Sequence, residues 1–119
     1  MRLRSDIFVS ALIRRTFGLG GFAAIERKGA DAAGAIFIRQ RFRDGLETLF
    51  GPAPQSLAMD KDDDPGESGA RRFEIRLARA EAEAVDAVIA RELKWDSDLW
   101  LLELEIDEIG DLLPVVSDD

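Results

Sequence analysis

The chain has 119 residues, a formal net charge of −8, and neither cysteine nor histidine. This length fits one domain, and the missing residue types exclude disulfide bonds, thiol chemistry, Ser-His-Asp catalysis and the His/Cys sites that zinc prefers. The charge is sorted along the chain, because residues 1–43 hold nine Arg or Lys against three Asp or Glu, whereas residues 44–119 hold seven against twenty-one. This division predicts either an anion-binding surface or neutralisation of one half of the fold by the other.

The basic half predicts one helix and three strands. Apolar residues recur at helical spacing over residues 5–17, behind a Ser-Asp pair that suits a helix N-terminus. A short strand is expected at 22–28, and residues 35–42 alternate clearly as a second strand. An Asp-Gly turn then predicts a hairpin to a partner strand at 46–50.

The acidic half predicts two further strands around one helix. Residues 73–77 alternate as a strand, residues 80–93 have helical spacing, and residues 99–106 alternate again. The segment 60–69 is rich in Asp and Gly, and we expect it to form an exposed acidic loop. Residues 110–119 are expected to be a disordered acidic tail.

These elements predict an α+β fold in the order α-β-β-β-β-α-β. We expect a mainly antiparallel sheet of four to five strands, with the two helices packed on one face. A single domain is expected over residues 1–109. The sequence has no apolar run long enough to span a membrane and no signal peptide pattern, so we expect a cytoplasmic protein without membrane contact.

An arginine stripe is the clearest candidate for an interaction surface. Arg39, Arg41 and Arg43 alternate along one strand and face the same way, at a spacing that could follow a phosphate backbone. Nucleic-acid-binding sheets usually place several exposed aromatics among the cations, and this face offers only one, so nucleic acid is not the favoured partner. We expect the arginines to pair instead with carboxylates, the candidates being Glu47, Glu103, Glu105 and Asp107.

Two other charged groups suggest ligand binding. Arg2 and Arg4 lie beside the start of the first helix, where free amide groups attract anions. Asp96 and Asp98 lie between two tryptophans and could support magnesium-assisted catalysis, although Asp-Ser-Asp is also an ordinary turn sequence. We favour the turn, and we therefore assign no catalytic residue, no metal site and no cofactor.

Four apolar residues are candidates for a protein–protein interface. Pro52 and Pro54 lie in an extended Gly-Pro-Ala-Pro segment that could contact a neighbouring chain. Trp95 and Trp100 are large side chains of the kind that anchor cores or interfaces. The partner could be a second copy of the chain or another protein.

Several segments carry a family resemblance in their order. They are residues 2–7, 34–38, 51–55, 71–73 and 96–100, followed by Glu103 and Glu105. Together they resemble a bacterial family of proteins defined as domain of unknown function 1491. The resemblance implies a small single-domain bacterial protein and supplies no activity or substrate. We therefore expect a non-enzymatic protein–protein interaction module, with polyanion binding through the arginine stripe and magnesium-assisted catalysis as alternatives.

Overall fold

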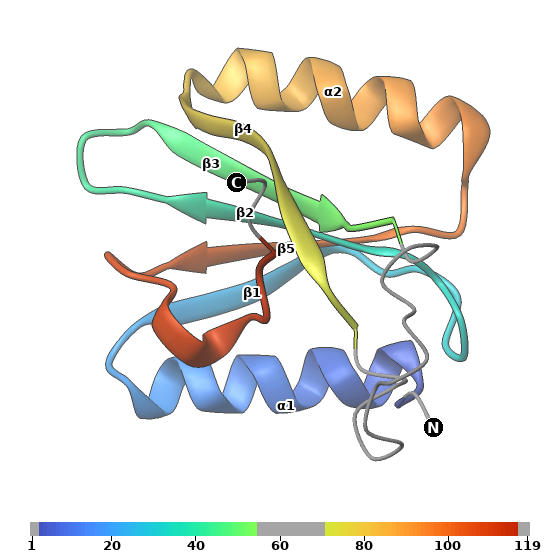
Figure 1. Ribbon diagram of the computed structural model, residues 1–119, viewed down its shortest axis with the longest axis horizontal. Helices are drawn as coiled ribbons and strands as arrows, with labels where there is room; N and C mark the ends of the chain where they lie inside the picture. Colours follow the sequence, from blue (N-terminus) through green and yellow to red (C-terminus); the bar gives the residue numbers. More distant parts are fainter. Residues whose placement is uncertain (1–2, 55–70, 117–119) are drawn as a thin grey trace.

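The computed structural model describes residues 3–54 and 71–116, and its elements follow the predicted order (Figure 1). The expected acidic loop at 60–69 lies outside the described residues. No helix in the described ranges is long and apolar enough to cross a membrane. The elements are α1 (Ser5–Gly18), β1 (Phe22–Arg27), β2 (Ile36–Arg41), β3 (Glu47–Pro52), β4 (Phe73–Ala80), α2 (Ala82–Trp95), β5 (Trp100–Glu105) and the short 3-10 helix η1 (Gly110–Leu112).

The five strands form one sheet in the order β1-β5-β2-β3-β4. Three strand pairs are antiparallel, while β2 and β5 run parallel, with Arg39 opposite Glu103. The α+β class and the mainly antiparallel sheet are therefore confirmed. The parallel pair arises because the chain crosses over through α2 before β5 enters the middle of the sheet.

The two helices lie on opposite faces of the sheet, so the expectation that both pack on one face is wrong (Figure 1). Val9 and Leu12 of α1 pack in one core cluster, whereas Val85 and Ile89 of α2 pack in another. The reason lies in β2, where the consecutive residues 36–38 are all buried. Because successive strand residues point to opposite faces, a run of this kind needs a cover on both sides.

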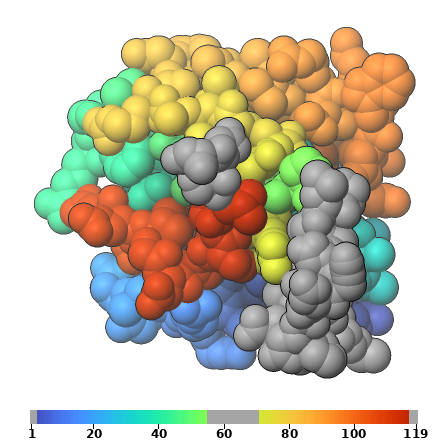
Figure 2. All heavy atoms as spheres, in the orientation of Figure 1, coloured from blue at the N-terminus to red at the C-terminus, as the bar shows by residue number. Residues whose placement is uncertain are grey.

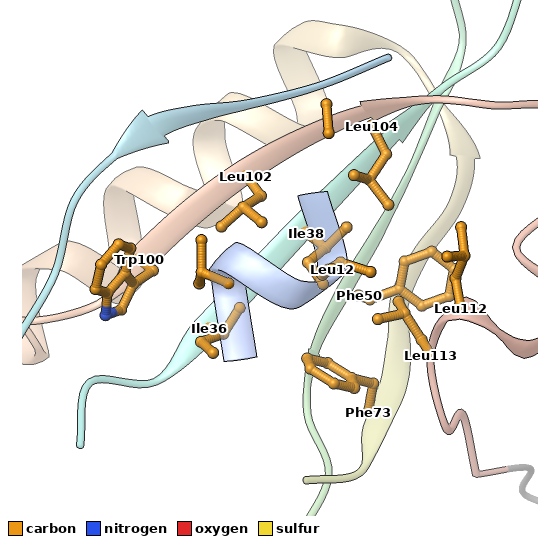
Figure 3. Close-up of a cluster of buried hydrophobic side chains, with 12 residues drawn as sticks. Leu12, Ile36, Ile38, Phe50, Phe73, Trp100, Leu102, Leu104, Leu112 and Leu113 are labelled. Atoms are coloured by element: carbon orange, nitrogen blue, oxygen red, sulfur yellow. The ribbon is translucent and has the colours of Figure 1, made fainter. Parts of the chain in front are cut away.

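The larger core cluster lies on the α1 side of the sheet (Figure 3). Leu12 of α1 points into it, and Ile36, Ile38, Leu102 and Leu104 rise from the two parallel central strands. The remaining labelled side chains extend the cluster across the sheet and include Phe50, Phe73, Trp100, Leu112 and Leu113. This face therefore draws on both ends of the chain.

The segment after β5 completes this core, so the prediction of a disordered tail from residue 110 is wrong for the described residues 110–116. Leu112 and Leu113 are buried, and Arg15 of α1 donates hydrogen bonds to the backbone oxygens of Asp111 and Leu112. Beyond them, Val115 forms a parallel bridge with Phe73 on the outer side of β4. Figure 2 shows this segment as a band between α1 and β4. Leu112 and Leu113 are buried despite the acidic residues around them, because α1 covers only part of this face of the sheet and they pack in the same core cluster.

Shortening Leu112 tests this role of the C-terminal segment. The side chain is 2% exposed, so Leu112→Ala should lower the free energy of unfolding by about 2–5 kcal/mol through lost burial and a residual cavity. The measurement is chemical denaturation followed by tryptophan fluorescence. The matched control is Leu19→Ala, because Leu19 is 66% exposed and its truncation should change little. Equal effects of the two substitutions would show that the C-terminal segment is not part of the core.

Candidate functional site

The arginine stripe lies on the α2 side of the sheet. Arg39 and Arg41 belong to β2, and Arg43 follows at the start of the hairpin. Phe37 of the same strand face is buried against α2, so this face is largely covered rather than open. The exposure of the arginine side chains rises along the stripe, from 7% for Arg39 to 36% for Arg41 and 87% for Arg43.

A buried carboxylate holds the first two arginines. Glu47 lies directly opposite Arg41 in the β2–β3 hairpin, and its side chain is 1% exposed. Arg39 donates from Nε to Glu47 Oε1 at 2.8 Å, and its Nη2 lies 2.6 Å from the same oxygen. Arg41 donates from Nε to Glu47 Oε2 at 2.9 Å. Both carboxylate oxygens are thus engaged, as a buried charge requires.

Three further carboxylates surround this centre. Arg39 Nη1 donates to Asp86 of α2 at 2.9 Å and to Glu26 of β1 at 3.4 Å. Arg41 Nη1 donates to Glu103 of β5 at 2.7 Å. We call these six residues the arginine–carboxylate network, comprising Arg39, Arg41, Glu26, Glu47, Asp86 and Glu103. The network joins α2 to four strands, namely β1, β2, β3 and β5.

The network holds its arginines in the charged form. Burial would lower the pKa of Arg39, but hydrogen bonds to Glu47 and Asp86 and the charges of Glu47 and Glu26 outweigh it, so the pKa is raised. The pKa of Arg41 is also raised, because its contacts with Glu47 and Glu103 outweigh burial and the neighbouring Arg39. An arginine side chain loses its proton only well above neutral pH, so both groups stay charged at any pH at which the protein is folded and studied.

The stripe is therefore neutralised within the fold, as the pairing interpretation predicts. Arg43 also has a partner, since its Nη2 lies 3.1 Å from Asp107 Oδ2. Glu47, Glu103 and Asp107 thus pair with the stripe as expected, whereas Glu105 makes no salt bridge with the described residues. Asp86 was not predicted as a partner, because a helix on this face was not expected, and Glu26 of β1 was not predicted either. Two arginines meet four carboxylates in the network, which leaves it net negative and unsuited to a polyanion.

A groove of about 720 Å³ lies where the parallel strands β2 and β5 end. Its floor and walls come from the residues that follow the two strands and from the turn between α1 and β1. This turn is tight, because Gly20 has a φ of 90° and a Cβ at Gly21 would lie 2.9 Å from the backbone oxygen of Glu105. The lining combines charged and apolar side chains and includes Leu19, Arg41, Phe42, Arg43, Glu105, Ile106, Asp107 and Glu108.

An exposed apolar group borders the groove. Phe17 at the end of α1 and Phe22 at the start of β1 stack edge to face, with their ring centroids 5.7 Å apart. Both rings are about half exposed, and Leu19 between them in the sequence is more exposed still. We call these three residues the apolar corner. This corner is not among the surfaces predicted from the sequence, although two aromatics flanking a glycine turn are a visible signal.

The other charged candidates take part in local structure. Arg4 lies before α1 and forms a salt bridge with Asp6 at 3.3 Å, while Arg2 lies outside the described residues. Asp96 Oδ1 accepts a hydrogen bond from the backbone N–H of Asp98 at 2.9 Å, which is turn chemistry. No group of Asp and Glu side chains in the described ranges is arranged to hold a metal ion. These contacts favour the turn over the magnesium hypothesis.

The four interface candidates separate in the structure. Trp100 is buried, and its indole N–H donates to the backbone oxygen of Ala30 at 2.9 Å, so it cannot contact a partner. Pro52 ends β3 and is partly buried, whereas Pro54 is exposed. Trp95 at the end of α2 is 88% exposed and stays available as an anchor.

The segments that carry the family resemblance meet at the other end of the sheet. Ser5 of α1 donates from Oγ to the backbone oxygen of Gly34 at 2.6 Å and accepts from Arg71 at 2.8 Å. The backbone N–H of Trp100 donates to Ala35 at 2.7 Å. These contacts join the starts of α1, β2, β4 and β5. The shared segments therefore have a structural role that needs no ligand.

The comparisons with known proteins agree with this fold. The family model described as "Protein of unknown function (DUF1491)" matches residues 3–114. A solution structure of a protein from A. tumefaciens is 60% identical over 100% of this chain and 98% of its own, with a TM-score of 0.83. A crystal structure of a DUF1491 family protein from Caulobacter crescentus is 31% identical over 98% of this chain and 100% of its own, with a TM-score of 0.75. No curated protein matches the chain.

Removing one arginine of the network should cost stability. Arg39→Met deprives the buried Glu47 of one of its two arginine partners. We expect the free energy of unfolding to fall by about 3 kcal/mol. This value is at the lower end of the range for a broken buried ion pair, because Arg41 still contacts Glu47. Chemical denaturation measures this loss. Arg43→Met is the matched control, because the Arg43–Asp107 pair is exposed and should contribute little.

A double variant separates lost pairing from lost packing. Arg39→Met combined with Glu47→Leu removes the buried carboxylate that has lost its Arg39 partner, and it should recover part of the stability lost by Arg39→Met alone. If Arg39→Met were as mild as Arg43→Met, the network would not be holding a buried charge.

Proposed function

The chain belongs to the DUF1491 family, and we propose that it acts as a non-enzymatic protein–protein interaction module whose contact surface is the apolar corner. The partner is bound and is not chemically transformed. The groove beside the corner supplies the polar rim of this surface.

The observation that carries this proposal is the exposure of two stacked phenylalanines. Burying an aromatic side chain stabilises a core, yet Phe17 and Phe22 remain 51% and 44% exposed. Aromatic residues are enriched at the centre of protein interfaces, where a small number of anchors supply most of the binding free energy. With Leu19, they form an apolar group beside charged residues, which is the usual arrangement of an interface core and rim.

The competing functions have weaker support. Polyanion binding would need free cations on the sheet, and all three arginines of the stripe contact carboxylates. Magnesium-assisted catalysis would need Asp96 and Asp98 in a common pocket, but Asp96 is engaged in the turn and neither residue lines the groove. A protein–protein interaction surface needs neither free cations nor paired carboxylates, and the exposed side chains of the apolar corner are sufficient for it.

Site-specific crosslinking in bacterial cells tests the proposal. A photoreactive residue in place of Leu19 should give a discrete adduct with one protein, because Leu19 projects from the apolar corner. The same residue in place of Arg91, which is exposed on α2, is the control and should not give that adduct. The Phe17→Ser/Phe22→Ser variant should reduce the Leu19 adduct at least fivefold, and the purified partner should bind the unchanged chain but not this variant.

An adduct that forms equally from both positions, or that survives the double serine variant, would contradict the proposal. Thermal unfolding of the double variant shows whether the fold persists. It should, because both rings are substantially exposed.

A further inference from the structure

The outer edge of β1 is open. β1 is the last strand of the sheet, paired with β5 on one side, and no described strand lies against its other side. Phe22 and Ile25 on this strand are 44% and 46% exposed. Since they are three residues apart, they point to opposite faces of the sheet. A ligand that covered only one face would leave one of the two in water.

An added strand covers both side chains at once. Its own side chains alternate between the two faces, and its backbone pairs with the free N–H and C=O groups of the edge. A bulge between Ile25 and Arg27 interrupts the regular edge, so it extends only over residues 22–25. The edge therefore accepts a short segment and resists long edge-to-edge pairing.

The opposite edge of the sheet suits this role less well. At Phe73 the outer side of β4 is already paired with residues 114–116, through hydrogen bonds to Pro114 and from Val116. At its far end Arg79 has a φ of 45°, which bends the strand. Ile75 between them is 51% exposed, comparable to Phe22 and Ile25. It provides a matched control position on the other edge.

The charges beside the Phe22 end of β1 identify the kind of segment that fits there, whereas Arg27 and Lys28 lie at the other end of the strand. Glu105 lies opposite Phe22 in the β1–β5 pair, and Glu108 lines the groove beyond it. Neither forms a salt bridge with the described residues, whereas the groove arginines already contact carboxylates. A second copy of the chain would bring a further net charge of −8 to this edge. Charge complementarity therefore favours a different protein with a basic segment.

We propose that the free edge of β1 binds an extended segment of another protein, which adds as a sixth strand. Apolar side chains of the segment cover Phe22 and Ile25, and a Lys or Arg that follows them lies over Glu105 and Glu108. This inference rests on the proposed function and specifies how the partner is held.

The test uses a defined probe, the peptide acetyl-Lys-Lys-Val-Thr-Ile-Val-Lys-Lys-amide. Amide hydrogen exchange of the full chain is followed by NMR with and without the peptide at about 1 mM, a concentration that detects a weak strand addition. The backbone amides of residues 22–25 on the free edge should exchange at least tenfold more slowly with the peptide. Amides of β2 report the integrity of the fold in the same spectra.

Two control peptides separate backbone pairing from charge. N-methylation of alternate residues blocks strand pairing without changing the charge, and replacement of every Lys by Glu reverses the charge. Both should abolish the protection. Among protein variants, Phe22→Thr and Ile25→Thr should each weaken binding at least fivefold, while Ile75→Thr should leave it unchanged.

Protection that persists with the N-methylated or the acidic peptide would overturn the inference, and so would a complete lack of protection with the basic peptide. An adduct at Leu19 together with unprotected β1 amides would keep the proposed function and exclude strand addition. Failure of the chain with unchanged Phe17 and Phe22 to give any Leu19 adduct would overturn the proposed function itself, whatever the peptide does.

Discussion

The burial of Glu47 is the constraint on which the charged part of this fold depends. A carboxylate with 1% exposure is tolerated only where cations and hydrogen bonds replace the lost water, and Arg39 and Arg41 provide both. Each arginine then has donors left over, which reach α2, β1 and β5. The single buried charge of Glu47 thus fixes how α2, β1 and β5 lie against the β2–β3 hairpin.

This arrangement explains why the arginine stripe does not create a basic surface on the sheet. Arg39 and Arg41 of the first half lie on β2, and their partners come from β3, α2 and β5 of the acidic half, with Glu26 of β1 in addition. Neutralisation happens across the sheet rather than along the sequence. The apolar corner and the free β1 edge then remain as exposed features that internal packing does not account for.

The sequence predicted the elements well and their layers less well. Alternation and turn signals were sufficient for the strands and helices, because these depend on local spacing. The layers depend on which strand faces need cover, and the unbroken apolar run of residues 36–38 was the signal for two covered faces. The burial of Leu112 could not be predicted from local composition, because it depends on a gap that α1 leaves on the distant sheet. Glu47 was recognised as a possible partner of the stripe, but its central position depends on α2 lying above it.

Binding to a polyanion tests the central claim of internal neutralisation most directly. The purified chain is applied to a heparin column at low ionic strength, where a protein with a stripe of free arginines on its surface would be retained strongly. Neutralised arginines predict elution without retention, and Arg41→Met and Arg43→Met should behave in the same way as the unchanged chain. Salt-sensitive retention that disappears in those variants would contradict the account.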